Sequence, residues 1–475
     1  MCGIFGIVND DNYQSNKENL IKNRGPDNTI SLTKFNKYHF TFHRLCINDL
    51  SENGNQPFED DEAIVMCNGE IYNYKHLIQT FKLECSSNSD CEVILQLYKI
   101  MNVNDFVKLL DGVFAISIYD KKKEILYLIR DRIGVRPLFW SDVREYNEIK
   151  SISFASEGKC LDNPRQLRAG SILLYDTTDN NIIISPYYNL PHPKSVINYS
   201  EDIAQNHIYK LLEESVKKRL ISDRPIGCLL SGGLDSSLVA SILQKNTKES
   251  IKTFSVGFKD SVDLKCARRV ADYLKTEHYE LILDYDDAIS RIPEIIKCLE
   301  TYDVTTIRAS IGMYLLSEYI QKNHPERVIF SGEGSDEIFG GYLYFHKAPS
   351  DRDFVEESYR LVDELPYFDV LRADRCTSSF GLELRVPFLD KDLVNYCLSL
   401  SANIRKPKNG VEKWILRNSF DGKDYLPKDI LWRQKEAFSD GVGGLQKPFY
   451  KHIQEKIDKK ENVNDDDNER LYYFM

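Results

Sequence analysis

A cysteine directly follows the initiator methionine in the opening segment MCGIFGIV and precedes a short apolar run typical of a strand. Once Met1 is removed, Cys2 carries both a thiol and a free α-amine. An α-amine with an ordinary pKa of about 7.7–8.0 can take the proton of the thiol near neutrality, which would make Cys2 a nucleophile. The alternative is that Cys2 is a small hydrophobic residue with no chemical role.

A glycine- and serine-rich turn follows an apolar strand in LLSGGLDSSLVASIL. Gly232 and Gly233 let the main chain approach an anion closely because they lack a Cβ. Backbone amides at the start of the next helix, near Asp235 or Ser236, can bind phosphate oxygens together with the Ser231 hydroxyl. No Lys-Ser or Lys-Thr pair follows, so this is not the P-loop of GTPases. The alternative is a simple turn with Asp235 as a helix cap.

A second glycine-rich loop, in VIFSGEGSDEIFGGY, also follows a predicted strand and contains Glu333, Asp336 and Glu337. Carboxylates beside a polyphosphate are typical ligands of Mg²⁺. Two such loops at the carboxyl ends of parallel strands would face one crevice of an open α/β sheet. Asp336 and Glu337 could instead cap the following helix, but that interpretation explains only one of the two loops.

Length and composition limit the possible classes of protein. A chain of 475 residues predicts at least two domains, and 42% hydrophobic with 28% charged residues is typical of a soluble globular protein. A net charge of −11 without a basic stretch argues against nucleic-acid binding, so small-molecule ligands are expected. No membrane span or signal peptide is predicted, which favours a cytoplasmic protein. The eleven cysteines form no Cys-x-x-Cys pair, so neither a disulfide framework nor a zinc site is indicated.

The length and spacing of the apolar segments change along the chain. Short runs rich in Ile, Val, Phe and Tyr predict antiparallel sheets and an α+β domain over residues 2–187, with helices packed on the sheets. Two prolines among polar residues at 187–202 predict a linker. Strands then alternate with helices, which predicts a parallel-sheet α/β domain over residues 202–475, mainly helical in its later part. The charged stretch DKKENVNDDDNER predicts a mobile tail over residues 455–475.

At the two glycine-rich loops the sequence resembles the ATP pyrophosphatases, which cleave ATP to AMP and pyrophosphate. With MCGIFGIV, RGPD, HRLCIND, NGEIYN, SDCEVI and RDRIGVRPLF ahead of them, the resemblance is to the glutamine-hydrolysing asparagine synthetase family. The motifs ETYDVTTIRAS, DVLRADRCTSSFGLELRVPFLD and RQKEAFSDG extend it to about Ser439. The resemblance implies an N-terminal αββα sandwich of the Ntn type and a C-terminal ATP pyrophosphatase-like α/β domain with added helices. It also implies ligation of ammonia from glutamine to aspartate through β-aspartyl-AMP.

The resemblance assigns roles in a class II glutamine amidotransferase domain. Cys2 would attack the glutamine amide, while the Asn68 side chain and the Gly69 backbone N–H would form the oxyanion hole. Arg44 would bind the α-carboxylate of glutamine and Asp90 its α-ammonium. Taken singly, Arg44 could be a surface ion-pair partner, Asn68 a turn residue and Asp90 a helix cap. The same pocket would be lined by Leu45, Cys46, Ile47, Asn48 and Glu70.

The resemblance also assigns roles in the asparagine synthetase domain. Glu333 would serve the formation of the adenylate and the ammonia step. Lys435 would stabilise phosphate charge, although an exposed surface lysine is the ordinary alternative. Thr305 and Arg308 are candidates for aspartate or pyrophosphate contacts, and Mg²⁺ would be held by Asp235 and Asp336. Contacts to ATP, as substrate, are implied for Leu230, Ser231, Gly232, Gly233, Asp235, Ser236, Val256, Ser331 and Gly332.

Two other functions fit parts of this pattern. One is an ammonia-dependent synthetase with an inactive glutaminase, which glutamate release from glutamine would exclude. The other is a non-catalytic sensor of nutrients, which conversion of ATP to AMP in the presence of aspartate would exclude. We expect glutamine, aspartate and ATP as small-molecule partners, no nucleic acid or membrane, and a homodimer.

Overall fold

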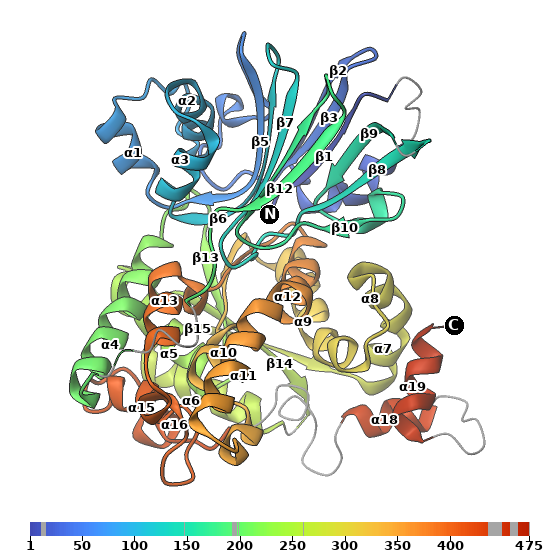
Figure 1. The fold of residues 1–475 in the computed structure, drawn as a ribbon. Coiled ribbons are helices and arrows are strands. Elements are labelled where there is room, and N and C mark those ends of the chain that lie inside the picture. The colour runs from blue at the N-terminus through green and yellow to red at the C-terminus, as the bar shows by residue number, and fades with distance from the viewer. Residues whose placement is uncertain are drawn as a thin grey trace. The chain divides into compact units, whose positions relative to one another are not determined.

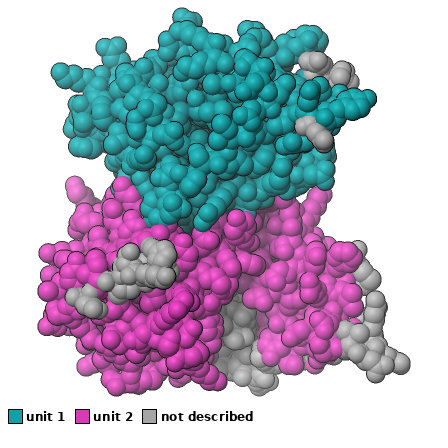
Figure 2. All heavy atoms as spheres, in the orientation of Figure 1, with its two compact units in different colours: residues 1–189, 221–224, 378–383 teal, residues 190–220, 225–377, 384–475 magenta. Residues whose placement is uncertain are grey.

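The computed structural model describes residues 1–10, 16–146, 148–191, 197, 199–259, 261–435, 449–456 and 464–474. The chain forms two compact units (Figure 2). Unit 1 comprises Met1–Asn189, Ile221–Arg224 and Ser378–Glu383, and unit 2 comprises Leu190–Leu220, Pro225–Thr377 and Leu384–Met475. Unit 1 therefore contains the predicted N-terminal domain, residues 2–187, together with two short segments from later in the chain.

Unit 1 contains two six-stranded antiparallel sheets (Figure 1). The first has the order β10-β8-β9-β1-β3-β2, with β1 (Gly3–Val8), β2 (Asn28–Lys34), β3 (Tyr38–Arg44), β8 (Phe139–Glu145), β9 (Glu148–Ala155) and β10 (Arg165–Gln166). The second has the order β12-β11-β7-β6-β5-β4, with β4 (Phe58–Glu59), β5 (Ala63–Ile71), β6 (Gly112–Asp120), β7 (Ile125–Arg130), β11 (Ser171–Asp176) and β12 (Asn181–Pro186).

Apolar side chains on alternating strand positions build the layers of unit 1. One buried cluster joins the two sheets and includes Phe40, Ile64 and Met66. Helices α1 (Tyr74–Phe81), α2 (Val93–Ile100) and α3 (Val103–Leu109) pack on the outer face of the second sheet. On the outer face of the first sheet, Phe5 packs with the 3-10 helices η1 (Lys17–Arg24) and η4 (Gly158–Cys160). The predicted αββα order is confirmed, but its fourth layer consists of 3-10 helices.

Unit 2 is built on a five-stranded sheet with the order β15-β14-β13-β16-β17. The strands are β13 (Ile226–Leu229), β14 (Lys252–Phe258), β15 (Glu277–Leu283), β16 (Val328–Phe330) and β17 (Glu383–Arg385), and the first four pair in parallel. Helices α4 (Glu201–Lys218), α5 (Leu234–Asn246), α6 (Val262–Leu274) and α9 (Val304–Asn323) alternate with them. The chain adds β14 and β15 on one side of β13 and β16 on the other, so the strand order reverses between β13 and β16. In open α/β sheets, ligands bind at such a reversal.

The later part of unit 2 is mainly helical, as predicted. Its α-helices are α7 (Tyr285–Ser290), α8 (Ile292–Leu299), α10 (Ser335–Phe339), α11 (Asp351–Glu364), α12 (Asp369–Ser378), α13 (Lys391–Ser399), α14 (Ala402–Arg405), α15 (Trp414–Phe420), α16 (Lys428–Leu431), α18 (Phe449–Lys456) and α19 (Asp465–Phe474). The remaining 3-10 helices of the described chain are η2 (Glu52–Gly54), η3 (Asp90–Glu92), η5 (Leu343–Lys347), η6 (Leu365–Tyr367) and η7 (Pro387–Leu389). None of the described helices is long and apolar enough to cross a membrane.

The end of the chain differs from the mobile tail predicted over residues 455–475. Within it, Asp465–Phe474 form helix α19, and residues 457–463 and 475 lie outside the described part. The Glu469 side chain is fully buried and accepts from the Arg308 Nε at 2.9 Å. Asp466 pairs with the same guanidinium at 2.8 Å. Carboxylates that look solvated in the sequence are thus held by a cation on α9.

Candidate active sites

Cys2 lies at the entrance to β1, which is flanked by β3 and β9. Its Sγ is 3.4 Å from the backbone nitrogen of Leu45, and its carbonyl accepts from the Arg24 Nε at 3.0 Å. With Met1 attached, burial raises the pKa of the Cys2 thiol to about 12 and lowers the pKa of the Met1 amine to about 6. The chain that carries Met1 therefore has a neutral thiol near pH 7. The α-amine of Cys2 becomes available as a base only after Met1 is removed.

Asn68 and Gly69 lie in the middle of β5. Side chains alternate along a strand, so Asn68 is on the same face as Met66, which packs in the cluster between the sheets where Cys2 also packs. Asn68 is fully buried, and neither atom of its amide has a hydrogen-bond partner in the described structure. A Cβ on Gly69 would come within 2.1 Å of the Val113 carbonyl oxygen, so only glycine fits there. An unpartnered buried amide is costly, which is consistent with a donor kept for a ligand.

Three residues predicted for the glutamine pocket meet around one amide group. The Asn48 Nδ2 donates to the Glu70 Oε2 at 2.6 Å and to the Asp90 Oδ1 at 3.1 Å. The backbone nitrogen of Ile71 donates to the other Asp90 oxygen at 2.6 Å. Burial raises the pKa of Asp90. Two carboxylates that converge on one donor form a site suited to an ammonium group.

Arg44, at the end of β3, binds the loop that follows it. Its Nη1 donates to the Ser51 carbonyl and to the Asn55 side chain, both at 2.7 Å, and its Nη2 donates to the Asp49 carbonyl. The guanidinium therefore orders the segment that carries Asn48, and its contact with the glutamine carboxylate stays a prediction. The residues between Arg44 and Asn48 also make contacts within unit 1. The backbone nitrogen of Leu45 lies next to the Cys2 Sγ, that of Cys46 donates to the Asp27 carboxylate, and the Ile47 carbonyl accepts from the backbone nitrogen of Asp223.

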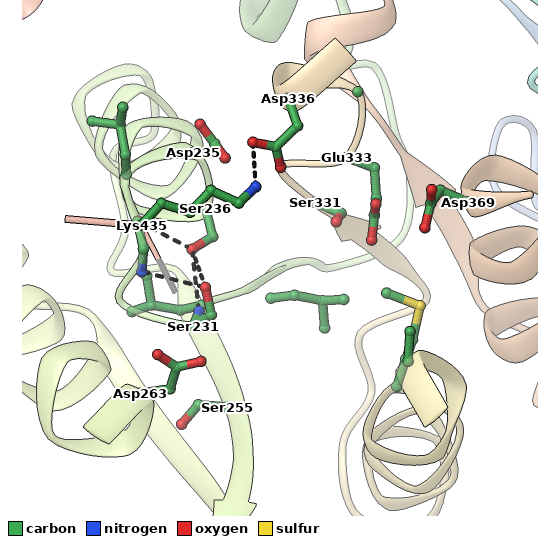
Figure 3. Close-up of a pocket in the computed structure, with 18 of the residues that line it drawn as sticks. Ser231, Asp235, Ser236, Ser255, Asp263, Ser331, Glu333, Asp336, Asp369 and Lys435 are labelled. Carbon is green, nitrogen blue, oxygen red and sulfur yellow. Dashed lines mark hydrogen bonds and ion pairs between the residues drawn. The ribbon is translucent and has the colours of Figure 1, made fainter. Parts of the chain in front are cut away.

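Unit 2 contains a cavity of about 370 Å³ at the loops that follow β13 and β16 (Figure 3). Two residues predicted for this site, Gly232 and Arg308, are not among the described residues that line it. The Gly232 carbonyl accepts from the Arg433 Nη1 at 3.2 Å, and Arg308 faces Glu469 and Asp466. The predicted residues that do line the cavity are Leu230, Ser231, Gly233, Asp235, Ser236, Val256, Thr305, Ser331, Gly332, Glu333, Asp336 and Lys435.

The loop after β13 already has the form of an anion site. Gly233 is the N-cap of α5, and the hydroxyls of Ser231 and Ser236 lie 2.9 Å apart. The backbone nitrogen of Gly233 donates to the Ser231 hydroxyl at 3.3 Å. Asp235 lies in the first turn of the helix and does not cap it; its carboxylate accepts from the Ser335 hydroxyl at 2.7 Å. The helix-cap interpretation of Asp235 is therefore wrong, and its side chain faces the second loop.

Two lysines neutralise the carboxylates at this edge of the sheet. The Lys413 Nζ contacts the Asp336 Oδ1 at 2.7 Å and also pairs with Asp235, while Lys435 pairs with the same Asp336 oxygen. Burial favours the protonated form of Asp336, but both ammonium groups oppose it and lower its pKa to about 2. Burial opposes the charge of Lys413, yet the carboxylates of Asp235 and Asp336 raise its pKa to about 12. Sequence reasoning missed Lys413, because one lysine between a turn and a helix resembles a surface residue.

A second charged group surrounds Glu333. The Arg372 Nη2 lies 3.1 Å from the Glu333 Oε1 and 3.1 Å from the Asp369 Oδ1. Burial raises the pKa of Glu333, Arg372 opposes this, and Asp369 adds to it. Burial, with Asp336 and Asp369, raises the pKa of Glu337 to about 8. Sequence reasoning gave Asp369 and Arg372 no role, although both lie in the quoted motif DVLRADRCTSSFGLELRVPFLD.

Two carboxylates of this cavity could hold Mg²⁺ together with ATP. Among the described residues, no group of three or more His, Cys, Asp or Glu side chains could hold a metal by itself. Mg²⁺ bound with a nucleotide needs only one or two carboxylates, since phosphates and water supply the other ligands. Asp235 and Asp336 fit this requirement, because both already contact one cation, the ammonium of Lys413.

The fold and the two sites define a class of protein in which a glutamine amidotransferase unit is joined to a synthetase unit that binds nucleotide. Residues 1–208 match the family described as glutamine amidotransferase domain, and residues 207–360 and 347–473 match asparagine synthase. The chain is 42% identical to asparagine synthetase [glutamine-hydrolyzing] from Gallus gallus over 97% of its length and 88% of that protein. The Homo sapiens protein of that name is 42% identical over 96% of this chain and 87% of its own length. The chain therefore belongs to the glutamine-hydrolysing asparagine synthetase family.

Solved structures are more distant. Glutamine phosphoribosylpyrophosphate amidotransferase from B. subtilis is 15% identical, with a TM-score of 0.33 over 59% of this chain and 81% of that chain. NMN synthetase from Francisella tularensis is 14% identical, with a TM-score of 0.27 over 58% of this chain and 93% of that chain. At these TM-scores the two structural similarities add nothing to the family assignment.

Proposed function

We propose that this protein is a carbon–nitrogen ligase that makes L-asparagine from L-aspartate, ATP and glutamine. The reaction passes through β-aspartyl-AMP and releases AMP, pyrophosphate and glutamate. The observation that carries this proposal is the 42% identity to asparagine synthetases [glutamine-hydrolyzing] over nearly the whole chain. Both candidate sites lie within the matched residues, so glutamine hydrolysis and adenylation are attributed to the same chain.

In unit 1, the mature Cys2 attacks the side-chain amide of glutamine after its own α-amine takes the proton of the thiol. The charge that develops on the amide oxygen is stabilised by the Asn68 side chain and the Gly69 N–H, which is consistent with the unpartnered Asn68 amide. Asp90 binds the α-ammonium of glutamine, and Arg44 binds its α-carboxylate. Hydrolysis of the resulting thioester releases glutamate, and ammonia leaves in the preceding step.

In unit 2, the β-carboxylate of aspartate attacks the α-phosphorus of ATP, and pyrophosphate leaves. The loop Ser231–Ser236 binds the pyrophosphate, because its serine hydroxyls and the start of α5 offer donors for phosphate oxygens. Lys435 stabilises the charge on the phosphates. Glu333 takes a proton from ammonia as it attacks the adenylate, a role consistent with a buried carboxylate of raised pKa.

Mg²⁺ is proposed as the cofactor, held by Asp235 and Asp336. It would offset the negative charge of the departing pyrophosphate, and the supporting observation is that both carboxylates contact one ammonium group. Thr305 lines the cavity and is proposed to contact aspartate or pyrophosphate. The same role for Arg308 requires that its ion pairs with α19 open. A homodimer and a cytoplasmic location remain predictions.

Coupling of the two reactions has a chemical reason. The β-carboxylate of aspartate is a poor electrophile until it is adenylated, and the adenylate must be kept from water. Ammonia is the nucleophile, yet it becomes ammonium in bulk solvent near neutral pH. We therefore propose that ammonia released at Cys2 reaches the adenylate without mixing with solvent.

The test is a reaction with amide-labelled glutamine, aspartate, ATP and Mg²⁺, analysed for all products. Labelled asparagine, AMP, pyrophosphate and glutamate in equal amounts are expected, and excess unlabelled ammonium should not dilute the label in asparagine. Asparagine formed from ammonium without glutamate release would favour the synthetase with an inactive glutaminase. Absence of AMP in the presence of aspartate would refute ligase activity and favour a sensor.

A further inference from the structure

Lys413 occupies an unusual position for a lysine. It directly precedes α15 with a left-handed backbone, at φ +53° and ψ +31°. A residue with a Cβ is uncommon in this conformation, and such conformations concentrate at functional sites. The Lys413 side chain is only 3% exposed and lines the cavity of unit 2. A lysine is seldom buried this completely unless its charge is paired.

The Lys413 ammonium connects the two loops of the nucleotide site. It pairs with Asp235, in the first turn of α5 after β13, and with Asp336, in the first turn of α10 after β16. These carboxylates belong to different strand–loop–helix units, so they are neighbours only because β13 and β16 pair in the sheet. One side chain thus stands where a divalent cation would bind both carboxylates.

Gly341 leaves the space through which the Lys413 side chain passes. A Cβ at Gly341 would lie 2.1 Å from the Lys413 Cε and 2.0 Å from the Asp336 Oδ1. Both distances are shorter than real Cβ contacts, so a side chain at position 341 would have to displace the ends of the Lys413 and Asp336 side chains. The local packing therefore favours one path for this lysine, toward the two carboxylates.

The charges around the cavity suggest an exchange of partners. Lys413 and Lys435 balance Asp235 and Asp336 in the free protein. Carboxylates and phosphate oxygens are the preferred ligands of Mg²⁺. An ammonium group on a flexible stem is a suitable partner for phosphate, because its donors can rotate toward new acceptors. When Mg²⁺ and ATP enter together, the carboxylates gain a better cation and the lysine gains a better anion.

We propose that Lys413 is a further catalytic residue of the adenylation reaction. In the free enzyme it keeps Asp235 and Asp336 together. When the nucleotide binds, Lys413 gives up the carboxylates to Mg²⁺ and donates to the phosphate oxygens that leave as pyrophosphate. This role deepens the proposed function of the cavity and rests on it. It predicts that Lys413 competes with divalent cations in the absence of nucleotide and assists the reaction in its presence.

The first measurement is Mn²⁺ binding to the nucleotide-free full-length protein, followed by electron paramagnetic resonance. In Lys413→Met the Cβ and the backbone conformation are kept and the charge is lost. We expect Mn²⁺ to bind this variant at least about fivefold more tightly, since one positive charge about 4 Å away has that effect even in bulk water. Lys408→Met is the matched control, because Lys408 pairs with Glu201 and is not among the cavity-lining residues. Its Mn²⁺ affinity should equal that of wild type.

The second measurement is aspartate-dependent release of pyrophosphate at saturating Mg²⁺, ATP and aspartate. Lys413→Met should lower kcat by about a hundred- to thousandfold, the typical effect of losing one group that stabilises charge in a transition state. Hydrolysis of glutamine should be unchanged. Lys413→Gln, a neutral polar replacement, should give the same results as Lys413→Met in both assays. It replaces the methionine variant if that variant does not fold.

The outcomes separate this proposal from its alternatives. Equal or weaker Mn²⁺ binding in both neutral variants overturns it, because Lys413 would then not compete for the carboxylates. Tighter Mn²⁺ binding with unchanged pyrophosphate release overturns the catalytic role. The Mn²⁺ titration needs neither aspartate nor product, so a wild-type protein that makes no asparagine would refute the proposed function without altering the metal result.

Discussion

Replacement of Asn68 by alanine should remove glutaminase activity without loss of stability. The Asn68 side chain is fully buried, and neither of its polar atoms has a partner in the described structure. Burial without a hydrogen bond costs about 1–3 kcal/mol, a cost that the alanine variant no longer carries. The variant loses the packing of a small side chain in exchange. Because these effects oppose each other, we expect the free energy of unfolding to change by less than about 1 kcal/mol.

The effect on chemistry should be large. Loss of one oxyanion-hole donor typically lowers kcat by about a hundred- to thousandfold. The assay is glutamate release from glutamine under saturating conditions, with urea unfolding measured on the same preparations. Asparagine synthesis from ammonium should stay at the wild-type rate, because the adenylation site is in the other unit.

Asn73 provides the matched control. Its Nδ2 donates to the Leu109 carbonyl at 2.9 Å, and its Oδ1 accepts from the Asp111 backbone nitrogen at 2.9 Å. Asn73→Ala should therefore cost about 1–3 kcal/mol of stability, from two lost hydrogen bonds, and leave glutaminase activity within about twofold of wild type. If Asn68→Ala is destabilised as much as Asn73→Ala, or keeps its glutaminase activity, then the Asn68 amide is not a donor reserved for the oxyanion.

Three further predictions concern both units. Cys2→Ala should abolish glutamine-dependent but not ammonia-dependent asparagine synthesis, and mass spectrometry of the wild-type N-terminus should show that Met1 is absent; loss of both activities in folded protein would contradict the division of labour. Because the pKa of Glu337 is raised from 4.5 to about 8, the stability it contributes is present below pH 4.5 and is lost as pH rises toward 8. Urea titrations should show that the free energy of unfolding falls by up to about 1.4 kcal/mol per pH unit because of this group, and Glu337→Gln should lack this fall. Equal pH dependence of the free energy of unfolding in the wild type and the variant would contradict the raised pKa. Glu469→Gln weakens the buried ion pair with Arg308, so the amides of α19 should exchange hydrogen faster, and unchanged exchange would show that the pair does not hold the helix.

The sequence alone determined most of the elements and predicted the kind of chemistry, because both depend on residues that are near one another in the chain. Alternating apolar residues predict the strands of unit 1, and the change to alternating strands and helices predicts the parallel sheet of unit 2. The same holds for MCGIFGIV and the two glycine-rich loops, where residues within a short stretch predict a nucleophile and an anion site. The predicted αββα order and parallel sheet were confirmed.

Only the tertiary structure decided which charges meet. Lys413 is 178 residues from Asp235, and no local pattern distinguishes it from a surface lysine. Arg308 and Glu469 are 161 residues apart, and they pair where the sequence predicts a mobile tail and the structure has a helix at Asp465–Phe474. The physical reason is that an ion pair depends on distance in space and on burial, and both are set by the order in which strands and helices pack. The composition of a segment contains neither quantity.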